Sequence, residues 1–324
     1  MLNAILSWAL LGATLAITMA SHAQDYPSKP IKVVVPYPPG GSVDRIARLV
    51  ADKLREKWGQ SVIVENRSGA TGGIGSEYVY KSVPDGYTLL YAPPGPLVIN
   101  KRLYPGLGYD SDSFVPISIV ATLPYVLVVT AKPRLPAETI QQFIGSARAN
   151  PGRINYASQG TGGSPHLSAE LLKSMAGIDM VHIPYKGLGP ALAGLFGGEV
   201  DMMFDTVATV LPHVRSGKLR ALAVGSENRN RFMPNVPAMA EMLPGFLSSS
   251  WHGVVAPPKT PQAIAISLST AIAEGLKQPD LAKRLLEMSV DSVGSTPAET
   301  DAFMKQESER WGNVIRITGT KGES

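Results

Sequence analysis

One local pattern occurs twice in this chain and limits the folds that it can adopt. A short apolar run is followed by a loop with a glycine pair, and the loop leads directly into an amphipathic helical pattern. The first copy covers residues 31–35 (IKVVV) and 36–44 (PYPPGGSVD), and the second covers 154–157 (INYA) and 158–164 (SQGTGGS). Buried strands that alternate with helices are typical of parallel sheets with crossover helices. The sequence therefore predicts an α/β fold with one such unit in each of two lobes.

The alternation continues along the chain. Further strands are predicted at residues 61–65, 88–91, 181–183, 200–204 and 219–224, and helices at 76–82, 165–175, 191–196 and 212–215. In the helix after the first loop, Ile46, Val50 and Leu54 fall on one stripe and Gly59 follows its last turn, which favours a buried amphipathic helix. The C-terminal stretch is helical, and Thr296 to Glu299 forms a capping box with proline at the first helical position.

Two extended segments indicate where the chain crosses between the lobes. Residues 117–133 are long for one strand and are interrupted by Pro124, and residues 246–261 return in extended form. The predicted division is a discontinuous first lobe, residues 24–123 with 250–324, and a second lobe, residues 124–249. Lobes that are joined by crossing strands can hinge, and small molecules bind in clefts between such lobes.

The first 23 residues resemble an export leader. An apolar stretch over residues 4–20 is followed by Ser21-His22-Ala23, a small-x-small pattern suited to cleavage before Gln24. No Lys or Arg precedes the apolar stretch, so an uncleaved membrane anchor is the alternative. We expect a signal peptide over residues 1–23 and an exported mature protein.

Composition and motifs exclude several kinds of site. The chain has no cysteine, which excludes disulfides, thiolate catalysis and Cys-ligated metals. The 30 Lys and Arg and the 26 Asp and Glu give a formal charge of +4, and the basic residues form no long run. This pattern does not indicate a nucleic-acid surface. Neither a P-loop nor a G-x-G-x-x-G run is present. We expect no cofactor, no metal and no nucleic-acid partner.

Catalytic motifs are also missing from the sequence. It contains neither a G-x-S-x-G elbow nor an H-E-x-x-H pair, and the histidines outside the leader lack metal-ligand spacing. One pair, Ser164 and His166, could serve a hydrolase, but side chains two residues apart at a helix start diverge. The sequence favours a non-catalytic protein, and a hydrolase that uses Ser164 and His166 is the alternative.

Glycine pairs precede three of the predicted helices, at residues 40–41, 72–73 and 162–163. Glycine allows positive φ and close approach of a ligand to the backbone. The unpaired N–H groups and partial positive charge of a helix N-terminus favour an anion. We predict Ser42 and Ser164 as N-caps. Two such loops that face each other would hold a carboxylate, and a simple tight strand-to-helix connection is the alternative role of each.

Polar residues at other strand ends are further candidates. Asp205 follows a strand at the edge where α/β sheets bind ligands, or it caps the next turn. Asp44 lies in a first helical turn and acts through water, through a donor on the ligand or only as a cap. Tyr185 and Lys186 are placed to contact a carboxylate, and Tyr37 could form a wall of the site with its ring and hydroxyl.

Taken together, these segments resemble the Bug-type receptors, the periplasmic substrate-binding proteins of tripartite tricarboxylate transporters. The likeness runs through residues 26–92, 154–206, 219–226 and 248–261, and so covers essentially the whole mature chain. It implies a class II periplasmic-binding-protein fold, with hinged lobes and mainly parallel sheets, that closes around a small organic acid. It also implies a periplasmic monomer that serves membrane permease subunits. A ligand-presenting component of a two-component sensor is the alternative.

The resemblance also implies which residues bind the acid. In this family backbone amides and ordered waters of the first strand-to-helix loop hold one carboxylate, and the matching residues here are Tyr37, Gly41, Ser42, Val43 and Asp44. The second lobe contributes Ser158, Gly160, Thr161, Gly163 and Asp205. Ala92 and Pro93 match a further position, where this chain has prolines in place of the family's Gly-Ser-Thr-rich stretch. Because proline removes donors, we expect a more apolar wall and a mono- or dicarboxylate with an aromatic or aliphatic tail.

Overall fold

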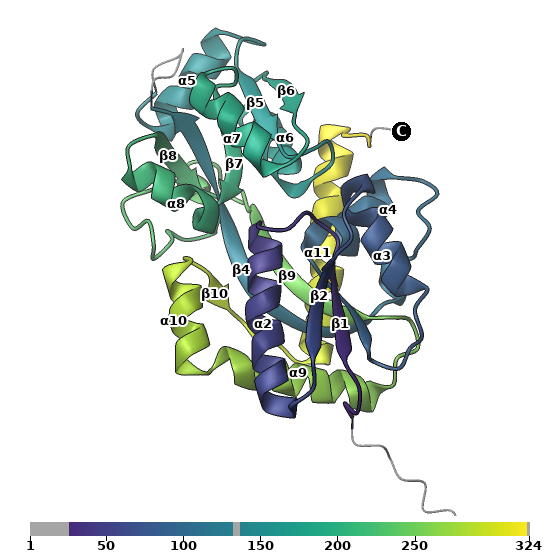
Figure 1. Cartoon of the computed structure of the whole chain (residues 1–324). Coiled ribbons are helices and arrows are strands. Elements are labelled where there is room, and N and C mark those ends of the chain that lie inside the picture. The colour runs from purple at the N-terminus through teal and green to yellow at the C-terminus, as the bar shows by residue number, and fades with distance from the viewer. Residues whose placement is uncertain (1–25, 132–136, 323–324) are drawn as a thin grey trace, which may run out of the picture.

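Ten strands and ten α-helices build the part of the chain that the computed structural model describes, residues 26–131 and 137–322 (Figure 1). The strands are β1 (Ile31–Val35), β2 (Val62–Asn66), β3 (Thr88–Ala92), β4 (Val115–Thr130), β5 (Asn155–Ser158), β6 (Val181–Pro184), β7 (Met202–Thr206), β8 (Leu219–Val224), β9 (Ser249–Ala256) and β10 (Asp291–Ser292). The leader that we predict for residues 1–23 lies outside the described residues.

Helices alternate with these strands along most of the chain. They are α2 (Ser42–Trp58), α3 (Gly73–Tyr80), α4 (Asn100–Leu103), α5 (Ile140–Ala149), α6 (Ser164–Ala176), α7 (Leu188–Gly197), α8 (Val207–Arg215), α9 (Gln262–Leu276), α10 (Pro279–Glu287) and α11 (Pro297–Thr318). Short helical turns are η1 (Ala70–Gly72), η2 (Gly95–Ile99), η3 (Ser111–Ser113) and η4 (Met239–Glu241). In the part of the chain described, we find no helix with the length and apolarity needed to cross a bilayer.

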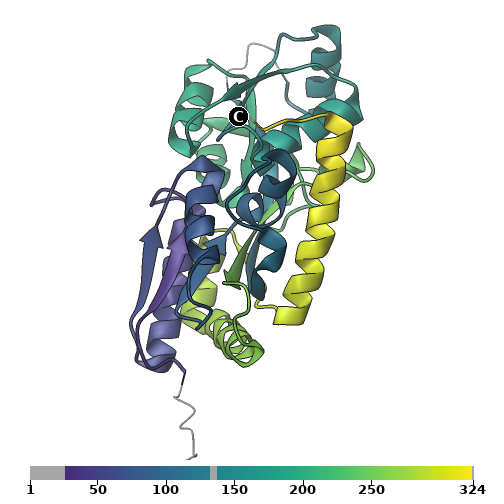
Figure 2. The same ribbon diagram turned by 90° about the vertical axis from the view of Figure 1, so that its right-hand side faces the viewer.

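Strand β4 passes through both lobes and exchanges its partners on the way (Figure 1). Up to Pro124 it pairs with β9, and from Tyr125 onward it pairs with β7 along one edge and with β8 along the other. The change of partners at this point supports the predicted lobe boundary, which remains a prediction. Figure 2 shows α11 along the side of both lobes, where it contacts β4, η2 and α6.

The fold is the predicted two-lobed α/β arrangement, with one correction to the sheets. The outer strands are parallel, in the orders β2-β1-β3 and β6-β5-β7. The crossing strands β4 and β9 are antiparallel to each other because the chain passes between the lobes in opposite directions. The expectation of mainly parallel sheets is therefore right only for the outer strands.

Three chain segments meet tightly where the lobes join. Tyr125 N–H donates to the Ser248 carbonyl at 3.3 Å, Gly225 N–H donates to the Tyr125 carbonyl at 2.6 Å, and Ser248 N–H donates to the Gly225 carbonyl at 2.8 Å. A Cβ atom on Gly225 would lie 2.3 Å from the Ser248 carbonyl oxygen. Glycine is therefore required here so that the backbones can approach each other.

The predicted helices are present, with shifts at some ends. The stripe Ile46, Val50 and Leu54 of α2 is buried in the first-lobe core, as predicted. The capping box of α11 is also confirmed, with Thr296 N–H donating to the Glu299 carboxylate at 2.9 Å and Glu299 N–H to Thr296 Oγ1 at 3.3 Å. The helix predicted over residues 76–82 spans Gly73–Tyr80. The helix predicted over residues 212–215 begins earlier, at Val207, so Pro212 lies inside α8 and not at its start.

Candidate functional site

Both glycine-pair loops end in a helix whose N-cap is a glycine. The N-caps of α2 and α6 are Gly41 and Gly163, in extended conformations with φ of −72° and −67°, and neither makes a side-chain cap bond. The prediction of Ser42 and Ser164 as N-caps is therefore wrong. Both serines already lie in the first helical turn, and no side chain of the described residues caps the first-turn N–H groups of either helix.

In the first loop, Asp44 accepts a hydrogen bond from the residue that precedes the N-cap. Its carboxylate accepts from Gly40 N–H at 2.9 Å, from the Arg48 guanidinium at 2.8 Å and from Asn66 Nδ2 at 3.0 Å, and the residue is 4% exposed. Burial tends to raise the pKa of Asp44, but the hydrogen bonds from Arg48, Gly40 and Asn66 outweigh it and hold the pKa below its ordinary value. Asp44 thus orders the loop as a charge-compensated carboxylate.

The same loop leaves a run of backbone donors open. None of the four N–H groups from Gly41 to Asp44 has an acceptor within residues 26–131 and 137–322. These groups belong to the first turn of α2, where the helix dipole adds partial positive charge. Because Arg48 and Asn66 already engage the Asp44 carboxylate, its repulsion of an anion here is reduced. The first loop is therefore suited to hold a carboxylate through backbone donors.

The second loop uses its glycine amides internally. Gly160 N–H donates to Ser158 Oγ at 3.2 Å, Gly162 N–H to His166 Nδ1 at 2.9 Å, and Gly163 N–H to the Gly160 carbonyl at 3.4 Å. The N–H groups of Ser164 and His166 have no acceptor in the described part of the chain. The donors available here therefore belong to the start of α6 and not to the glycines, contrary to what the glycine pattern alone suggests.

The second loop also touches the first lobe directly. The Tyr104 hydroxyl, just after α4, donates to the Thr161 carbonyl at 2.9 Å. A Cβ atom on Gly162, whose φ is +78°, would lie 2.6 Å from Leu103 Cδ1 and 3.0 Å from the Tyr104 hydroxyl. Thr161 and Gly162 are thus packed against the end of α4, which brings the second-lobe loop to the junction of the lobes.

Tyrosine hydroxyls occupy the space at this junction. Burial raises the pKa of Tyr37 far above its ordinary value, and the nearby hydroxyls of Tyr109, Tyr125 and Tyr104 add to the effect. Burial also raises the pKa of Tyr125 to about 12, and its hydroxyl bonds with the side chains of Ser250 and Ser164. These shifts keep the phenols of Tyr37 and Tyr125 protonated at neutral pH. They lie between the first loop and the start of α6. Among these tyrosines, the sequence predicts only Tyr37 as a site residue.

The segment that follows β3 lies beside the Tyr37 hydroxyl. Ala92 is buried and Pro93 half-buried, and the chain then enters η2, a π-helical turn, a feature often found at functional sites. A Cβ on Gly95 would lie 3.1 Å from the Tyr37 hydroxyl and 3.7 Å from Asn100 Oδ1. Asn100 Oδ1 is buried without a partner among the described residues. The turn places an apolar segment beside Tyr37, and the predicted apolar wall for a ligand remains a prediction.

Asp205 and Tyr185 already have partners in the protein. Asp205 is 3% exposed at the end of β7, and its carboxylate accepts from Thr206 N–H at 2.7 Å and from Gln159 Nε2 at 2.6 Å. Burial raises the pKa of Asp205 to about 6. The Tyr185 hydroxyl donates to Glu199 at 3.1 Å. Asp205 therefore lies beside the second loop through Gln159, whereas Tyr185 uses its hydroxyl elsewhere.

Ser164 and His166, the pair that a hydrolase would use, do not interact with each other. His166 Nδ1 accepts from Gly162 N–H, the Ser164 side chain bonds with Tyr125, and no hydrogen bond joins Ser164 to His166. Over residues 26–131 and 137–322, no three His, Asp or Glu side chains are grouped so that they could hold a metal ion. The geometry of this region supports binding through donors and offers no activated nucleophile.

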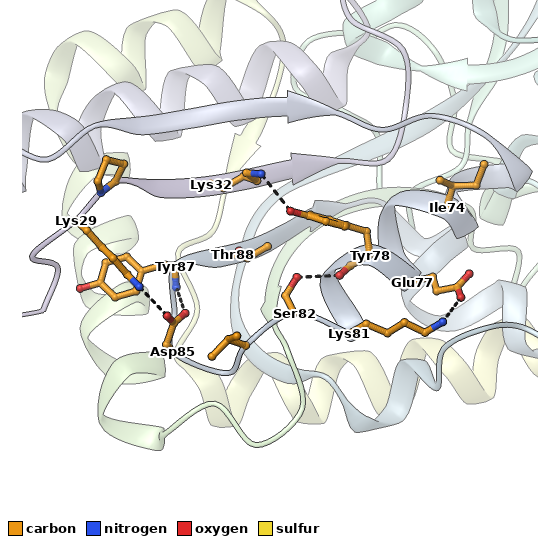
Figure 3. A pocket seen from close by; sticks show the side chains of 12 residues that line it. Lys29, Lys32, Ile74, Glu77, Tyr78, Lys81, Ser82, Asp85, Tyr87 and Thr88 are labelled. Carbon is orange, nitrogen blue, oxygen red and sulfur yellow. Dashed lines mark hydrogen bonds and ion pairs between the residues drawn. The ribbon is translucent and has the colours of Figure 1, made fainter.

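A surface hollow of about 800 Å³ lies elsewhere, between α3 and the strands β1 and β3 of the first lobe (Figure 3). Three lysines line it. Lys29 is paired with Asp85, Lys32 with Glu65, and Lys81 with Glu77. Because each of these cations already has a carboxylate partner, the hollow offers an anion little uncompensated charge. The loops at the lobe junction are the better candidate for an anion site.

Comparisons with known proteins show the family of this chain. The family described as the tripartite tricarboxylate transporter family receptor matches residues 46–320. Protein BugT of Bordetella pertussis is 39% identical over 312 residues, which cover 95% of this chain and 95% of that protein.

Two solved structures are also similar over most of their length. The structure titled R. palustris Rpa4515 with adipate has a TM-score of 0.86 and 34% identity, and it covers 92% of this chain and 100% of that chain. MatC from Rhodopseudomonas palustris with bound malate has a TM-score of 0.81 and 30% identity, and it covers 90% of this chain and 100% of that chain. These relatives are solute-binding receptors and not enzymes. The chain therefore belongs to the tripartite tricarboxylate transporter receptor family, and it is a Bug-type periplasmic binding protein.

Proposed function

We propose that this protein captures a small organic carboxylate between its lobes and delivers it to the membrane permease subunits of a tripartite tricarboxylate-type transporter. One observation carries the proposal. Open backbone N–H groups at the starts of α2 and α6 lie in the loops that border the lobe junction. Helix starts of this kind are suited to anions. Two similar proteins were solved with adipate and with malate, which are both dicarboxylates.

The tyrosines at the junction define the chemistry that the ligand would meet. Tyr37 and Tyr125 keep their protons at neutral pH, so each can donate to a carboxylate oxygen or to a hydroxyl on the ligand. The half-buried Pro93 and the buried η2 turn offer carbon surface beside Tyr37. We therefore favour a mono- or dicarboxylate whose carbon skeleton, aromatic or aliphatic, lies against η2.

Mass spectrometry of small molecules released from the purified protein tests the first part of this proposal. We expect a stoichiometric carboxylic acid, and calorimetry with that compound should give a 1:1 complex without chemical turnover. Recovery of a cation or of a neutral compound without a carboxylate, with no binding of any acid, would contradict the proposal. Release of a reaction product would favour an enzyme instead.

Delivery to a transporter needs a separate measurement. In cells that lack this gene, uptake of the isotope-labelled acid should fall to background and recover on complementation. A variant that binds normally but fails to restore uptake would identify the surface that the permease recognises. Normal uptake in the deletion strain, together with loss of a transcriptional response to the acid, would show that the protein serves a sensor and not a transporter.

A further inference from the structure

Two histidines of the second lobe lie face to face behind the glycine loop. The rings of His166 on α6 and His182 on β6 are stacked, with centroids 3.9 Å apart and planes inclined by 9°. Tyr156 on β5 continues the stack, with its ring centroid 4.9 Å from that of His182. The parallel register of β5 and β6 places Tyr156 opposite His182. The sheet pairing therefore builds the stack.

His166 reaches one glycine of the loop. Its Nδ1 atom accepts a hydrogen bond from Gly162 N–H at 2.9 Å, and the side chain is 6% exposed. Because a backbone N–H can only donate, Nδ1 carries no proton, and the proton of the neutral ring is on Nε2.

His182 reaches the other end of the loop through a serine. Ser158 Oγ lies 3.0 Å from the Gly160 carbonyl oxygen and 2.6 Å from His182 Nε2. Its single proton can serve only one of these two contacts, so the tautomer of His182 decides which atom donates. The Gly160 N–H also donates to Ser158 Oγ. One imidazole thus fixes Gly162 and the other fixes Gly160.

We propose that the stacked pair His166 and His182 is the positioning element of the second-lobe anion loop. The inference rests on the proposed function for its consequence. The pair holds the open N–H groups of Ser164 and His166 in place before an anion arrives, so binding does not have to order the loop. In this proposal the backbone N–H of His166 binds the ligand, while its imidazole ring holds Gly162.

The surroundings of His166 favour its neutral state. Burial lowers the pKa of His166 to about 4, and Glu170 and Lys173 of α6 act on it in opposite directions, the first raising and the second lowering it. Tyr156 presents a phenol that donates to Glu170 and carries no charge. Two charged rings in stacking contact would repel each other. Protonation of His166 would also turn Nδ1 into a donor that faces the Gly162 N–H, so acid should release the loop.

Nuclear magnetic resonance of the wild-type protein tests the proposal without any ligand. With ¹⁵N-labelled histidine and glycine, we expect an unprotonated Nδ1 and a protonated Nε2 on His166 at pH 7. On acidification, the Gly162 amide signal should shift with the same midpoint as His166, near pH 4. A His166 ring that carries its proton on Nδ1 at pH 7 would overturn the proposal, as would a ring that titrates near its ordinary value while Gly162 stays unchanged.

Two substitutions separate the acceptor from the stack. His166→Phe keeps a stacked ring but has no acceptor, whereas His166→Asn supplies an oxygen close to the position of Nδ1. We expect hydrogen exchange at the Gly162 amide to be about five- to tenfold faster in His166→Phe and within about twofold of wild type in His166→Asn, as the loss of one hydrogen bond implies. Equal exchange rates in all three proteins would overturn the proposal.

A matched pair at the second histidine completes the design. His182→Gln keeps a hydrogen-bonding amide group near the position of Nε2, and His182→Phe has none. The Gly160 amide should exchange faster only in His182→Phe, and melting temperatures check that each variant folds. Unchanged exchange at Gly160 in both variants would remove His182 from the positioning element. Since no readout uses a ligand, the result stands whether or not the proposed carboxylate function is confirmed.

Discussion

The starts of α2 and α6 share one backbone-to-side-chain hydrogen bond but differ in the charge of the acceptor. In each, the first glycine of the pair donates its N–H to the side chain four residues later, from Gly40 to Asp44 and from Gly162 to His166. The first acceptor is an ionised carboxylate compensated by Arg48, and the second is a neutral imidazole held in a ring stack. A carboxylate and a neutral imidazole therefore accept the same kind of backbone hydrogen bond, and only the carboxylate brings a charge to the proposed anion site.

The difference matters for what each loop offers to a bound anion. The first loop leaves the four N–H groups of Gly41 to Asp44 without acceptors in the described chain, and the second leaves those of Ser164 and His166, since Pro165 has none. The first loop thus has more donors and also a nearby carboxylate, whereas the second has fewer donors and no charge. We infer that the first loop contributes most of the binding and that the second completes it on closure.

The largest expected effect comes from filling the glycines beside the open donors. A Cβ atom on Gly41 meets no atom within 4 Å, and one on Gly163 meets only ordinary contacts at 3.5 Å and beyond, so Gly41→Val and Gly163→Val should fold. Each should weaken binding of the recovered carboxylate about 100-fold or more, because charge-assisted hydrogen bonds are each worth roughly 1.5–3 kcal/mol. Calorimetry measures the loss in each variant, and a larger loss for Gly41→Val would support the ranking of the loops.

Gly145→Val is the matched control for these two variants. Gly145 lies on the exposed face of α5, has an ordinary φ, and has open space where a Cβ atom would go. Its affinity should equal that of wild type. Unchanged affinity in Gly41→Val and Gly163→Val as well would show that neither helix start touches the ligand.

The second effect is a pH dependence that belongs to the second loop. Burial raises the pKa of Asp205 from 3.8 to about 6, so between these values the folded state binds more protons than the unfolded state. The stability contributed by this group is therefore full below pH 4 and is lost as the pH rises through 6. Asp205→Asn should be stabilised relative to wild type by on the order of 2 kcal/mol more at pH 7 than at pH 4. Urea unfolding at both pH values tests this, and a pH-independent difference would contradict it.

The third effect concerns the charge in the first loop. Asp44→Asn keeps an oxygen for the Gly40 N–H but removes the ion pair with Arg48. If Asp44 mainly orders the loop, affinity for the recovered acid should fall about tenfold, since one charged hydrogen bond is weakened. An increase in affinity would show instead that Asp44 repels the anion, and would reverse our ranking of the loops. Melting temperature separates loss of fold from loss of binding.

The smallest effect should come from the contact between the lobes. Tyr104→Phe removes the hydrogen bond to the Thr161 carbonyl and keeps the ring packing. One neutral hydrogen bond is worth about 1 kcal/mol, so affinity should fall about three- to fivefold. Stopped-flow kinetics should show this mainly as faster dissociation. A Tyr104→Phe variant with wild-type kinetics would indicate that Thr161 is positioned without this contact.

The sequence predicts the features that depend on local periodicity. The strand, glycine loop and helix of each unit, the buried stripe of α2 and the capping box of α11 all follow from patterns a few residues long. The acceptors of the loops depend on pairings far apart in the chain. Asn66 reaches Asp44 because β1 and β2 pair in parallel, and His182 reaches the second loop because β6 pairs with β5. No local pattern encodes these contacts.

The segment after β3 was missed for a different reason. Residues 93–99 carry prolines and glycine, which favour a loop, yet the chain forms η2 and continues into α4. Burial of Leu97, Val98 and Ile99 in the core overrides the local preference.

The most direct test of the central claim is a crystal structure of the protein with its recovered carboxylate. We predict carboxylate oxygens within about 2.7–3.2 Å of backbone nitrogens between Gly41 and Asp44, or of a water that those nitrogens hold, and a second polar contact at the start of α6. A carboxylate held by side-chain cations away from both helix starts, with those N–H groups still without an acceptor, would contradict the account.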